Sequence, residues 1–281
     1  MSGTLFVVAT PIGNLEDITL RALRVLREVD LIACEDTRQT AKLLNHYQIQ
    51  KPTTSYHDYN EIEKADRLLA QLQSGKTVAL VSDAGTPCIS DPGYRIVRAS
   101  LEAGIRVIPL PGPCAFVTAL SACGRPTDLF TFLGFLPSKK GARRKVLESL
   151  KTTPGTLVFY ETAQRIVESL QDVEDVLGTR SVTIAREMTK VYEEIFFGST
   201  VEAIRRYTPS PVKGEIVLII ERASASPVSV SSFGEQELRD RLHELVRTGS
   251  VSKAEAIKQL AQQLGTSRRD LYQLLLSTKK E

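Results

Sequence analysis

The sequence contains few cysteines and few histidines, and their spacing excludes several kinds of site. The four cysteines are Cys34, Cys88, Cys114 and Cys123. They form no CxxC pair, which argues against a disulfide framework and a zinc site and favours reduced thiols in the cytosol. The three histidines are His46, His57 and His243. Since they lack metal-ligand spacing, metal-dependent hydrolysis and Ser–His–Asp catalysis both lose support.

Several motifs of nucleotide-binding and hydrolytic enzymes are also absent. No two glycines stand two positions apart, so the G-x-G-x-x-G dinucleotide fingerprint is missing. Gly75-Lys76-Thr77 resembles the end of a phosphate-binding P-loop, but position 70 is alanine and the tripeptide precedes a predicted strand instead of a helix. There is no H-E-x-x-H and no G-x-S-x-G motif. The chain is built like a nucleotide-binding α/β protein but lacks the usual phosphate-binding loops. A ligand without phosphates, carrying an adenosine and an amino acid, would suit it.

The composition is that of a soluble globular protein with a substantial core, 42% hydrophobic and 25% charged. The 281 residues allow two domains of ordinary size with a small appendage. Met1–Thr4 leads directly into a strand-like run without the basic segment of a signal peptide, and no apolar run reaches the length of a membrane span. The net charge of +3 permits an anionic partner without requiring one. We therefore expect a cytoplasmic protein.

Predicted strands and helices alternate in the first part of the chain. The predicted strands are Leu5–Ala9, Leu31–Ala33, Thr53–His57, Val78–Val81 and Arg106–Pro109. The predicted helices are Ile18–Val29 with Asp17 as N-cap, Asn60–Leu72 with Asn60 as N-cap, and Tyr94–Ala103. Such alternation is typical of a largely parallel, doubly wound α/β sheet, which we expect over residues 1–125.

From about Leu129 the predicted strands lie closer together along the chain. They are Thr131–Phe135, Leu157–Tyr160, Val182–Ala185, Glu194–Phe197 and Glu215–Ile220, with helices over Gln164–Leu177 and Val201–Tyr207. This pattern predicts a mixed α+β domain over residues 126–223. The composition of Ser224–Ser232 is typical of a linker. Residues 233–281 are predicted to be a small helical domain, in which 254–276 have the spacing of a helix-turn-helix or of a simple helical hairpin.

The most informative segment is Ala79–Gly93, with the sequence ALVSDAGTPCISDPG. An apolar run ending at Val81 predicts a buried strand, and the glycines and prolines after it predict an irregular loop. In open α/β sheets, ligands bind in the crevice beyond the carboxyl ends of the strands. Gly85 would allow the backbone to approach a ligand closely. An ordinary strand-to-helix connection is the alternative.

Several motifs then occur in an order that resembles a known family. They are VATPIGNLEDIT at Val8–Thr19, CEDTR at Cys34–Arg38, SDAGTP at Ser82–Pro87, DPG at Asp91–Gly93, PGP at Pro111–Pro113 and GFLP at Gly134–Pro137. The chain resembles the bacterial 16S ribosomal RNA cytidine 2′-O-ribose methyltransferases of the tetrapyrrole-methylase (class III) superfamily, over residues 3–222 and more loosely beyond. The resemblance implies a two-domain tetrapyrrole-methylase-like fold, S-adenosyl-L-methionine as cofactor, and methylation of a 2′ oxygen in small-subunit RNA.

The resemblance also implies that the cofactor lies in a trough between two α/β domains. The cofactor-binding residues carried over by motif are Ala84, Gly85, Thr86, Ile89, Cys114, Ala115, Glu161, Arg186, Gly214, Glu215 and Ile216. Backbone groups of strand-end loops can bind an adenine edge without charged side chains. Turn geometry or core packing is the alternative for each residue, and a cysteine such as Cys114 is often a small buried side chain.

Methyl transfer to a ribose hydroxyl is helped by a base that removes the hydroxyl proton. The candidate catalytic residues are Glu35, His57, Glu187 and Lys190. Lys190 could instead lower the pKa of the hydroxyl by its charge. Helix capping or ion pairing is the alternative for every candidate base, and Asp36 in particular could cap the helix after it. We expect no metal.

Basic side chains provide candidate RNA contacts. These are Arg38, Lys139, Lys140, Arg143, Arg144, Arg268 and Arg269, the last two with Tyr272 nearby. Such clusters neutralise phosphates, although a solvated helix surface is the common alternative. The partners implied by the resemblance are 16S rRNA or the 30S subunit and a second copy of the chain; no membrane is implied.

Two other functions compete with RNA methylation. The first is methylation of a tetrapyrrole, which Ala9–Gly13 disfavours because small-molecule members of the superfamily typically carry a glycine-richer first loop. The basic run at 139–145 also has no role in that case. The second is a non-enzymatic nucleic-acid-binding protein that uses residues 254–276, and such a protein would not bind S-adenosylmethionine.

Overall fold

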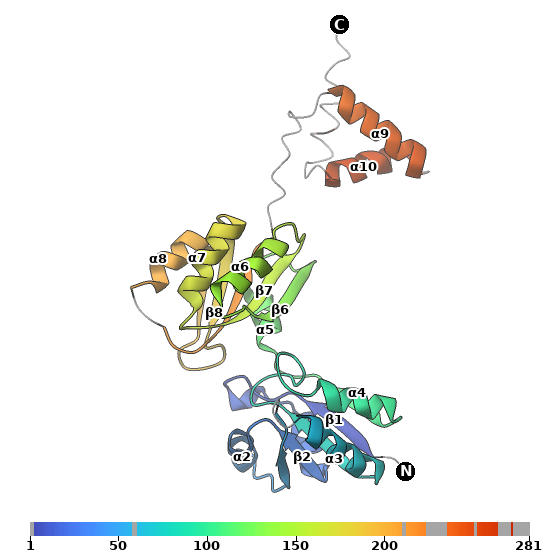
Figure 1. The fold of residues 1–281 in the computed structure, drawn as a ribbon, viewed down its shortest axis with the longest axis vertical. Coiled ribbons are helices and arrows are strands. Elements are labelled where there is room, and N and C mark those ends of the chain that lie inside the picture. Colours follow the sequence, from blue (N-terminus) through green and yellow to red (C-terminus); the bar gives the residue numbers. More distant parts are fainter. Residues whose placement is uncertain are drawn as a thin grey trace. The chain divides into compact units, whose positions relative to one another are not determined.

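The computed structural model describes residues 3–57, 61–209, 212–222, 235–249, 252–263 and 271. Met1–Lys151 and Gly155–Glu221 form one compact unit, and Thr152–Pro154 with Arg222–Glu281 form a second. The first unit contains two five-stranded sheets, one drawn in blue to cyan and the other in green to orange in Figure 1. The expected division of this part of the chain at residues 125 and 126 stays a prediction.

The first sheet contains only parallel strands. They are β1 (Thr4–Val8), β2 (Leu31–Cys34), β3 (Thr53–Ser55), β4 (Thr77–Val81) and β5 (Arg106–Leu110). Their order is β3-β2-β4-β1-β5, and every neighbouring pair is parallel. The helices of this part are α1 (Leu20–Glu28), α2 (Thr37–His46), α3 (Glu61–Gln73) and α4 (Tyr94–Glu102). The predicted parallel α/β sheet is confirmed.

Helices cover both faces of the first sheet (Figure 1). Leu26 of α1 and Leu44 of α2 lie in one core cluster, while Leu68 of α3 and Ile96 of α4 lie in another. Successive strand residues alternate between the two clusters because side chains of a strand point to opposite faces. Burial on both sides explains why these strands are apolar runs in the sequence.

The second sheet is mixed. Its strands are β6 (Phe130–Phe135), β7 (Thr156–Thr162), β8 (Ser181–Arg186), β9 (Glu194–Ser199) and β10 (Glu215–Ile220), in the order β6-β7-β10-β8-β9. Strand β6 is parallel to β7, and the other pairs are antiparallel. The helices are α5 (Ala115–Ala122), α6 (Lys140–Ser149), α7 (Ile166–Leu177) and α8 (Thr200–Tyr207). The predicted mixed α+β arrangement is confirmed.

The two faces of the second sheet have different neighbours. Leu147 of α6 and Leu170 of α7 pack on one face. On the other face, Leu120 of α5 shares a core cluster with Met188 and with Ile12, which follows the first strand of the first sheet. This cluster fixes the loops of the first sheet against the second sheet, and the candidate site lies there.

Some element boundaries differ from those expected. Helix α1 is capped by Thr19, whose Oγ1 accepts a hydrogen bond from the Ala22 amide at 3.0 Å. Asp17, the expected cap, instead ends a short 3₁₀ helix (Leu15–Asp17). Glu161 and Arg186 were expected just beyond strands but lie inside β7 and β8, which are longer than their apolar runs. Asn60 lies outside the described residues.

The C-terminal unit contains α9 (Glu235–Gly249) and α10 (Lys253–Gln263). Leu242 and Leu260 share its small core cluster. The predicted linker Ser224–Ser232 and most of the chain after 263 lie outside the described residues, so the helix-turn-helix remains a prediction. Among the described helices, none is long and apolar enough to cross a membrane.

Candidate functional site

A cavity lies where the loops at the carboxyl ends of the first sheet meet the second sheet. It contains about 800 Å³ of empty space, including the part open to solvent. Nine of the expected cofactor-binding residues line it: Ala84, Gly85, Thr86, Ile89, Cys114, Ala115, Glu161, Glu215 and Ile216. Segments far apart in the sequence therefore converge on one concave site, as ligand sites of open α/β sheets do.

The loop after β4 is held rigidly at the cavity. The Thr10 amide donates to the Gly85 carbonyl at 2.8 Å, and the Gly85 amide donates back to the Thr10 carbonyl at 3.0 Å. Thr86 Oγ1 donates to the Pro113 carbonyl at 2.9 Å. Gly85 has a φ of +87°, a left-handed conformation that favours glycine. The expected role of Gly85, a close approach of backbone to ligand, fits this geometry.

Two expected cofactor residues do not line the cavity. The Arg186 guanidinium pairs with Glu194, Nη2 to Oε2 at 2.7 Å, and also donates to the Lys213 carbonyl at 3.2 Å. Gly214 precedes the cavity residues Glu215 and Ile216 but is not itself part of the wall. Arg186 therefore makes contacts within the protein, and its expected contact with the cofactor stays a prediction.

Several cavity residues were not expected from the motifs. They include Ile12, Phe135, Tyr160, Met188 and Val217. Ile12 and Phe135 lie within quoted motifs, which was the available signal. The other three are apolar or aromatic residues in or next to predicted strands, where sequence alone does not separate a cavity wall from a core.

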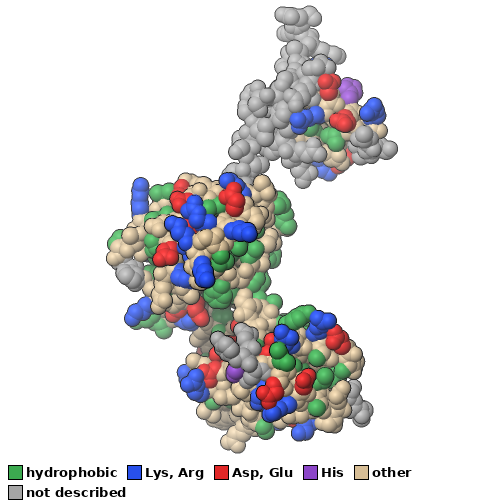
Figure 2. Space-filling view, viewed as in Figure 1, with side chains coloured by type: hydrophobic (Ala, Val, Ile, Leu, Met, Phe, Trp, Pro, Cys, Tyr) green, Lys and Arg blue, Asp and Glu red, His purple; other side chains and the backbone are tan. Residues whose placement is uncertain are grey.

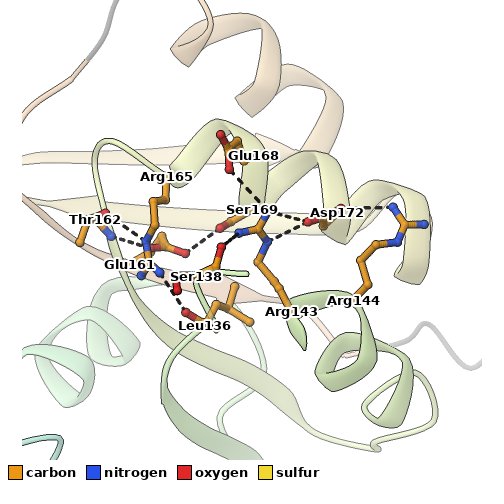
Figure 3. A network of polar contacts seen from close by, with 10 residues as sticks. All are labelled: Leu136, Ser138, Arg143, Arg144, Glu161, Thr162, Arg165, Glu168, Ser169 and Asp172. Atoms are coloured by element: carbon orange, nitrogen blue, oxygen red, sulfur yellow. Dashed lines mark hydrogen bonds and ion pairs between the residues drawn. The ribbon is translucent and has the colours of Figure 1, made fainter. Parts of the chain in front are cut away.

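Glu161 is a buried carboxylate on the cavity wall. Its side chain is fully buried, yet it pairs with Arg165 Nη2 at 2.6 Å and accepts from Ser169 Oγ at 2.6 Å. Figure 3 shows Arg165 reaching from Glu161 to the Leu136 carbonyl, to which its Nη1 donates at 3.2 Å. A buried charge is tolerated only with such partners. The wall is therefore fixed on the side away from the cavity.

Glu187 and Lys190 form an ion pair in the loop that follows β8, on the second-sheet side of the cavity. Lys190 Nζ lies 2.9 Å from Glu187 Oε1 and 3.2 Å from Glu215 Oε2. Burial raises the pKa of Glu187, but the hydrogen bonds from Lys190 and from the Glu215 amide outweigh it, so the pKa is lowered. Burial lowers the pKa of Lys190, but Glu187 and Glu215 outweigh it and the pKa is raised. Both groups are therefore charged near neutral pH.

The loop that carries this pair has unusual backbone geometry. Glu187 and Thr189 have φ values of +49° and +64°, which non-glycine residues rarely adopt and which cost about 1–3 kcal/mol each. Thr189 Oγ1 accepts from the Asn14 amide at 3.0 Å, so the loop is tied to the first-sheet side of the cavity. Such strain persists where surrounding contacts impose it, often at functional sites.

The other catalytic candidates lie away from the cavity wall. Glu35 and His57 are not among its lining residues. Asp36 caps α2 by accepting from the Arg38 amide, as the alternative interpretation predicts, and Arg38 lowers the pKa of that carboxyl to about 2. Arg38 Nη2 lies 2.7 Å from Asp36 Oδ2 while 88% of its side chain is exposed, so its expected RNA contact is sterically open.

The basic run at α6 divides into exposed and buried members. Lys139 and Lys140 are exposed, whereas Arg143 is only 1% exposed. Arg143 Nη2 lies 2.7 Å from Asp172 Oδ2, and Arg144 Nη1 lies 3.2 Å from Asp172 Oδ1 (Figure 3). Arg144 Nη1 also lies 2.7 Å from Asp175 Oδ2. The expectation that Arg143 contacts RNA is therefore wrong, because a buried, paired guanidinium cannot reach a phosphate.

The surface around α6 and α7 carries both signs of charge. Figure 2 shows Lys and Arg side chains interspersed with Asp and Glu over this part of the molecule. Arg268 and Arg269 lie outside the described residues. Among the described residues, no cluster of three or more His, Cys, Asp or Glu side chains could hold a metal ion.

Comparison with protein families gives one match over most of the chain. Residues 4–204 match the model of the Tetrapyrrole (Corrin/Porphyrin) Methylases. A protein of Halalkalibacterium halodurans named ribosomal RNA small subunit methyltransferase I is 48% identical, covering 97% of this chain and 94% of the relative. A protein of the same name from Escherichia coli O157:H7 is 54% identical over 78% of each chain.

Solved structures share the fold at low identity. The methyltransferase CobJ superposes with a TM-score of 0.60 at 19% identity, covering 79% of this chain and 95% of that one. Uroporphyrin-III C-methyl transferase from Thermus thermophilus, solved with S-adenyl homocysteine, superposes with a TM-score of 0.56 at 19% identity, covering 78% and 97%. At this identity the likeness supports the fold alone.

Proposed function

Because this chain belongs to the tetrapyrrole (corrin/porphyrin) methylase family and to its ribosomal RNA small subunit methyltransferase I members, we propose that it methylates small-subunit ribosomal RNA with S-adenosyl-L-methionine. The observation that carries this proposal is 48% identity over 97% of the chain to a relative of that name. The finer assignment, a cytidine 2′ oxygen of 16S rRNA, is the one implied by the motif resemblance. Its place of action would then be the cytoplasm.

The cavity fits the cofactor chemically. Its wall combines apolar side chains such as Ile12, Ile216 and Val217 with strand-end backbone, which suits an uncharged nucleoside. Glu187 and Glu215 share the single cation Lys190, and the net negative charge of this group suits the positively charged parts of S-adenosylmethionine. When bound, the cofactor supplies an electrophilic methyl group.

The chain's own residues then have two tasks at the acceptor. They must hold the ribose hydroxyl in line with the methyl group and must accept or stabilise the charge left when its proton leaves. Of the candidates Glu35, His57, Glu187 and Lys190, the last two line the cavity. We assign Lys190 to electrostatic stabilisation of the developing alkoxide, because its raised pKa keeps it protonated. Glu187, ionised beside it, is the candidate proton acceptor.

The proposed partners are the RNA substrate and a second copy of the chain. Lys139 and Lys140 are the proposed phosphate contacts, since both are exposed at the start of α6. Arg38 and the pair Arg268-Arg269 are further proposed contacts. Whether the assembled 30S subunit or free 16S rRNA is the substrate is decided by the experiment below, and the homodimer is proposed from the family resemblance.

A mapping experiment tests the function. The protein is incubated with radiolabelled S-adenosylmethionine and either 30S particles or naked 16S rRNA, and the modified nucleotide is located. We expect label on one ribose, visible as a site resistant to alkaline cleavage. Label on a base atom would refute the 2′-O assignment, and no label on either RNA would refute the function. Ala84→Trp, which places a bulky ring on the cavity wall, is the negative control and is expected to block the cofactor.

A further inference from the structure

Phe135 is a large apolar side chain on the cavity wall that is nevertheless half exposed. It is 52% exposed and lines the cavity from the end of the edge strand β6. Its ring lies 5.5 Å from the Tyr160 ring, centroid to centroid, and Tyr160 in turn contacts Phe132 at 4.9 Å. Phe132 is stacked on Phe116 at 4.3 Å. Phe135 is therefore the exposed end of a packed series of aromatic rings.

A β-bulge brings Phe135 to this face. Along β6, Phe132 pairs with Val158 and Phe135 pairs with Tyr160, so the chain contains one extra residue between the two pairs. Gly134 occupies the bulge with a φ of +65°. Without the bulge, residues three apart would point to opposite faces. With it, both phenylalanines reach Tyr160, and the second one enters the cavity wall.

Two arginines, the buried Arg143 and the partly buried Arg165, fix the segment that follows Phe135. Arg165 Nη1 donates to the Leu136 carbonyl at 3.2 Å, and Arg143 Nη1 donates to the Ser138 carbonyl at 3.3 Å (Figure 3). Both guanidiniums are held by carboxylates, Glu161 and Asp172. The backbone between Phe135 and the exposed Lys139 is thus fixed, and a preorganised surface loses little conformational entropy on binding.

We propose that Phe135 is a stacking platform for an unpaired nucleobase of the RNA substrate, at or next to the nucleotide that is methylated. The proposal rests on the function proposed above. Unpaired bases stack on aromatic side chains, and a nucleotide must leave its stack to enter a cavity. Phe135 lines the cavity while half exposed, and four residues of chain, at most about 14 Å, separate it from the exposed Lys139. A phosphate next to a base on its ring would therefore be within reach of Lys139 or Lys140. This neighbourhood of cations favours RNA over the cofactor adenine as the stacked group.

Steady-state kinetics test the platform. Phe135→Leu keeps an apolar side chain but removes the ring, and Phe135→Tyr keeps the ring. For Phe135→Leu we expect kcat/KM for RNA to fall by between about fivefold and about a hundredfold, through a higher KM, with the Kd for S-adenosylhomocysteine unchanged. Phe135→Tyr should retain near wild-type kinetics. The matched control is Phe197→Leu, because Phe197 is 53% exposed on β9, the other edge strand, and does not line the cavity.

Fluorescence gives a readout that does not depend on turnover. The chain contains no tryptophan, so Phe135→Trp introduces a single indole. The indole is excited at a wavelength longer than those that tyrosine absorbs. Its fluorescence should be quenched by single-stranded oligocytidylate in the presence of S-adenosylhomocysteine, whereas the fluorescence of Phe197→Trp should not change. Quenching by S-adenosylhomocysteine alone would assign the platform to the cofactor adenine and overturn the proposal.

The outcomes separate this inference from the proposed function. If wild-type protein methylates small-subunit RNA but Phe135→Leu has an unchanged KM for RNA, the platform is wrong and the function stands. A dimer that dissociates in Phe135→Leu, measured by sedimentation, would make Phe135 a contact between copies instead. If the wild-type protein labels no RNA, the function itself fails.

Discussion

At the scale of single residues, five cations between Lys139 and Lys145 have different surroundings. Lys139, Lys140 and Lys145 are exposed, whereas Arg143 is buried against Asp172. In the sequence they form one basic run, which is why Arg143 was expected to contact RNA. A helix turns about 100° per residue, so neighbouring positions face solvent and core in turn. Arg143 is buried because it lies on the side of α6 that packs against α7, and this packing is not visible in the sequence.

Arg143→Met should therefore destabilise the protein without acting on RNA directly. Removal of Arg143 leaves the buried Asp172 with a weaker contact, Arg144 Nη1 at 3.2 Å, so we expect the free energy of unfolding in urea to fall by up to about 3–5 kcal/mol. Arg143→Met combined with Asp172→Leu should recover part of this loss. By contrast, Lys139→Gln combined with Lys140→Gln should change the free energy of unfolding by less than about 0.5 kcal/mol. The same double variant should lower the slope of log K for RNA binding against log salt concentration by about 2, one for each lost phosphate contact. An unchanged salt dependence would make these lysines ordinary surface.

The Glu187–Lys190 pair predicts a pH dependence of stability. The pKa of Glu187 is lowered, so its contribution is present above the unfolded value of about 4.3 and is lost as the pH falls through the folded value. The pKa of Lys190 is raised, so its contribution is present below about 10.4 and is lost as the pH rises through the folded value. Between these two pH limits, the Tm of the wild type should exceed that of Lys190→Met by a constant difference of about 2–4 °C. A difference that grows towards pH 3 would contradict this assignment.

At the scale of elements, the sequence predicts the strands well and the cavity in part. Apolar runs such as Val78–Val81 are strands because both faces of the sheet are covered. Helix α5 was not predicted, because its sequence AFVTALSA lacks a polar face and so shows no helical periodicity. The motif loops identify Gly85 and Thr86, but Tyr160 and Met188 reach the cavity only through strand pairing and core packing. The strand register that produces the bulge before Phe135 is likewise absent from local sequence.

The bulge of β6 gives a test at this scale. Gly134→Ala places a Cβ at a φ of +65°, with Ser90 Oγ 3.1 Å away, so we expect a loss of about 1–2 kcal/mol in unfolding free energy. The matched control is Gly141→Ala in the first turn of α6, where the added Cβ meets nothing within 4 Å beyond its own helix backbone and chain neighbours. There the same change should raise stability, by up to about 1 kcal/mol, through helix propensity. Equal effects at both positions would show that the bulge imposes no backbone requirement.

At the scale of the whole molecule, cofactor binding should not require the C-terminal part of the chain, whereas RNA binding should be strengthened by it. Every lining residue of the cavity lies between Ile12 and Val217, within the first compact unit. The second unit contains α9 and α10, with their own core cluster. The C-terminal helices are thus not needed to complete the cavity wall, and the proposed contacts Arg268 and Arg269 belong to the part of the chain that can be removed.

A chain ending at Arg222 should therefore bind cofactor like the full chain. We expect its Kd for S-adenosylhomocysteine, measured by calorimetry, to stay within about twofold, and ligand at 100 times Kd to stabilise both chains by about 2.7 kcal/mol. Its affinity for RNA should fall and depend less on salt, because the two proposed phosphate contacts Arg268 and Arg269 are lost. A weakened cofactor Kd would mean that residues beyond 222 complete the site. Unchanged RNA binding would leave Lys139 and Lys140 as the principal phosphate contacts and remove Arg268 and Arg269 from the interface.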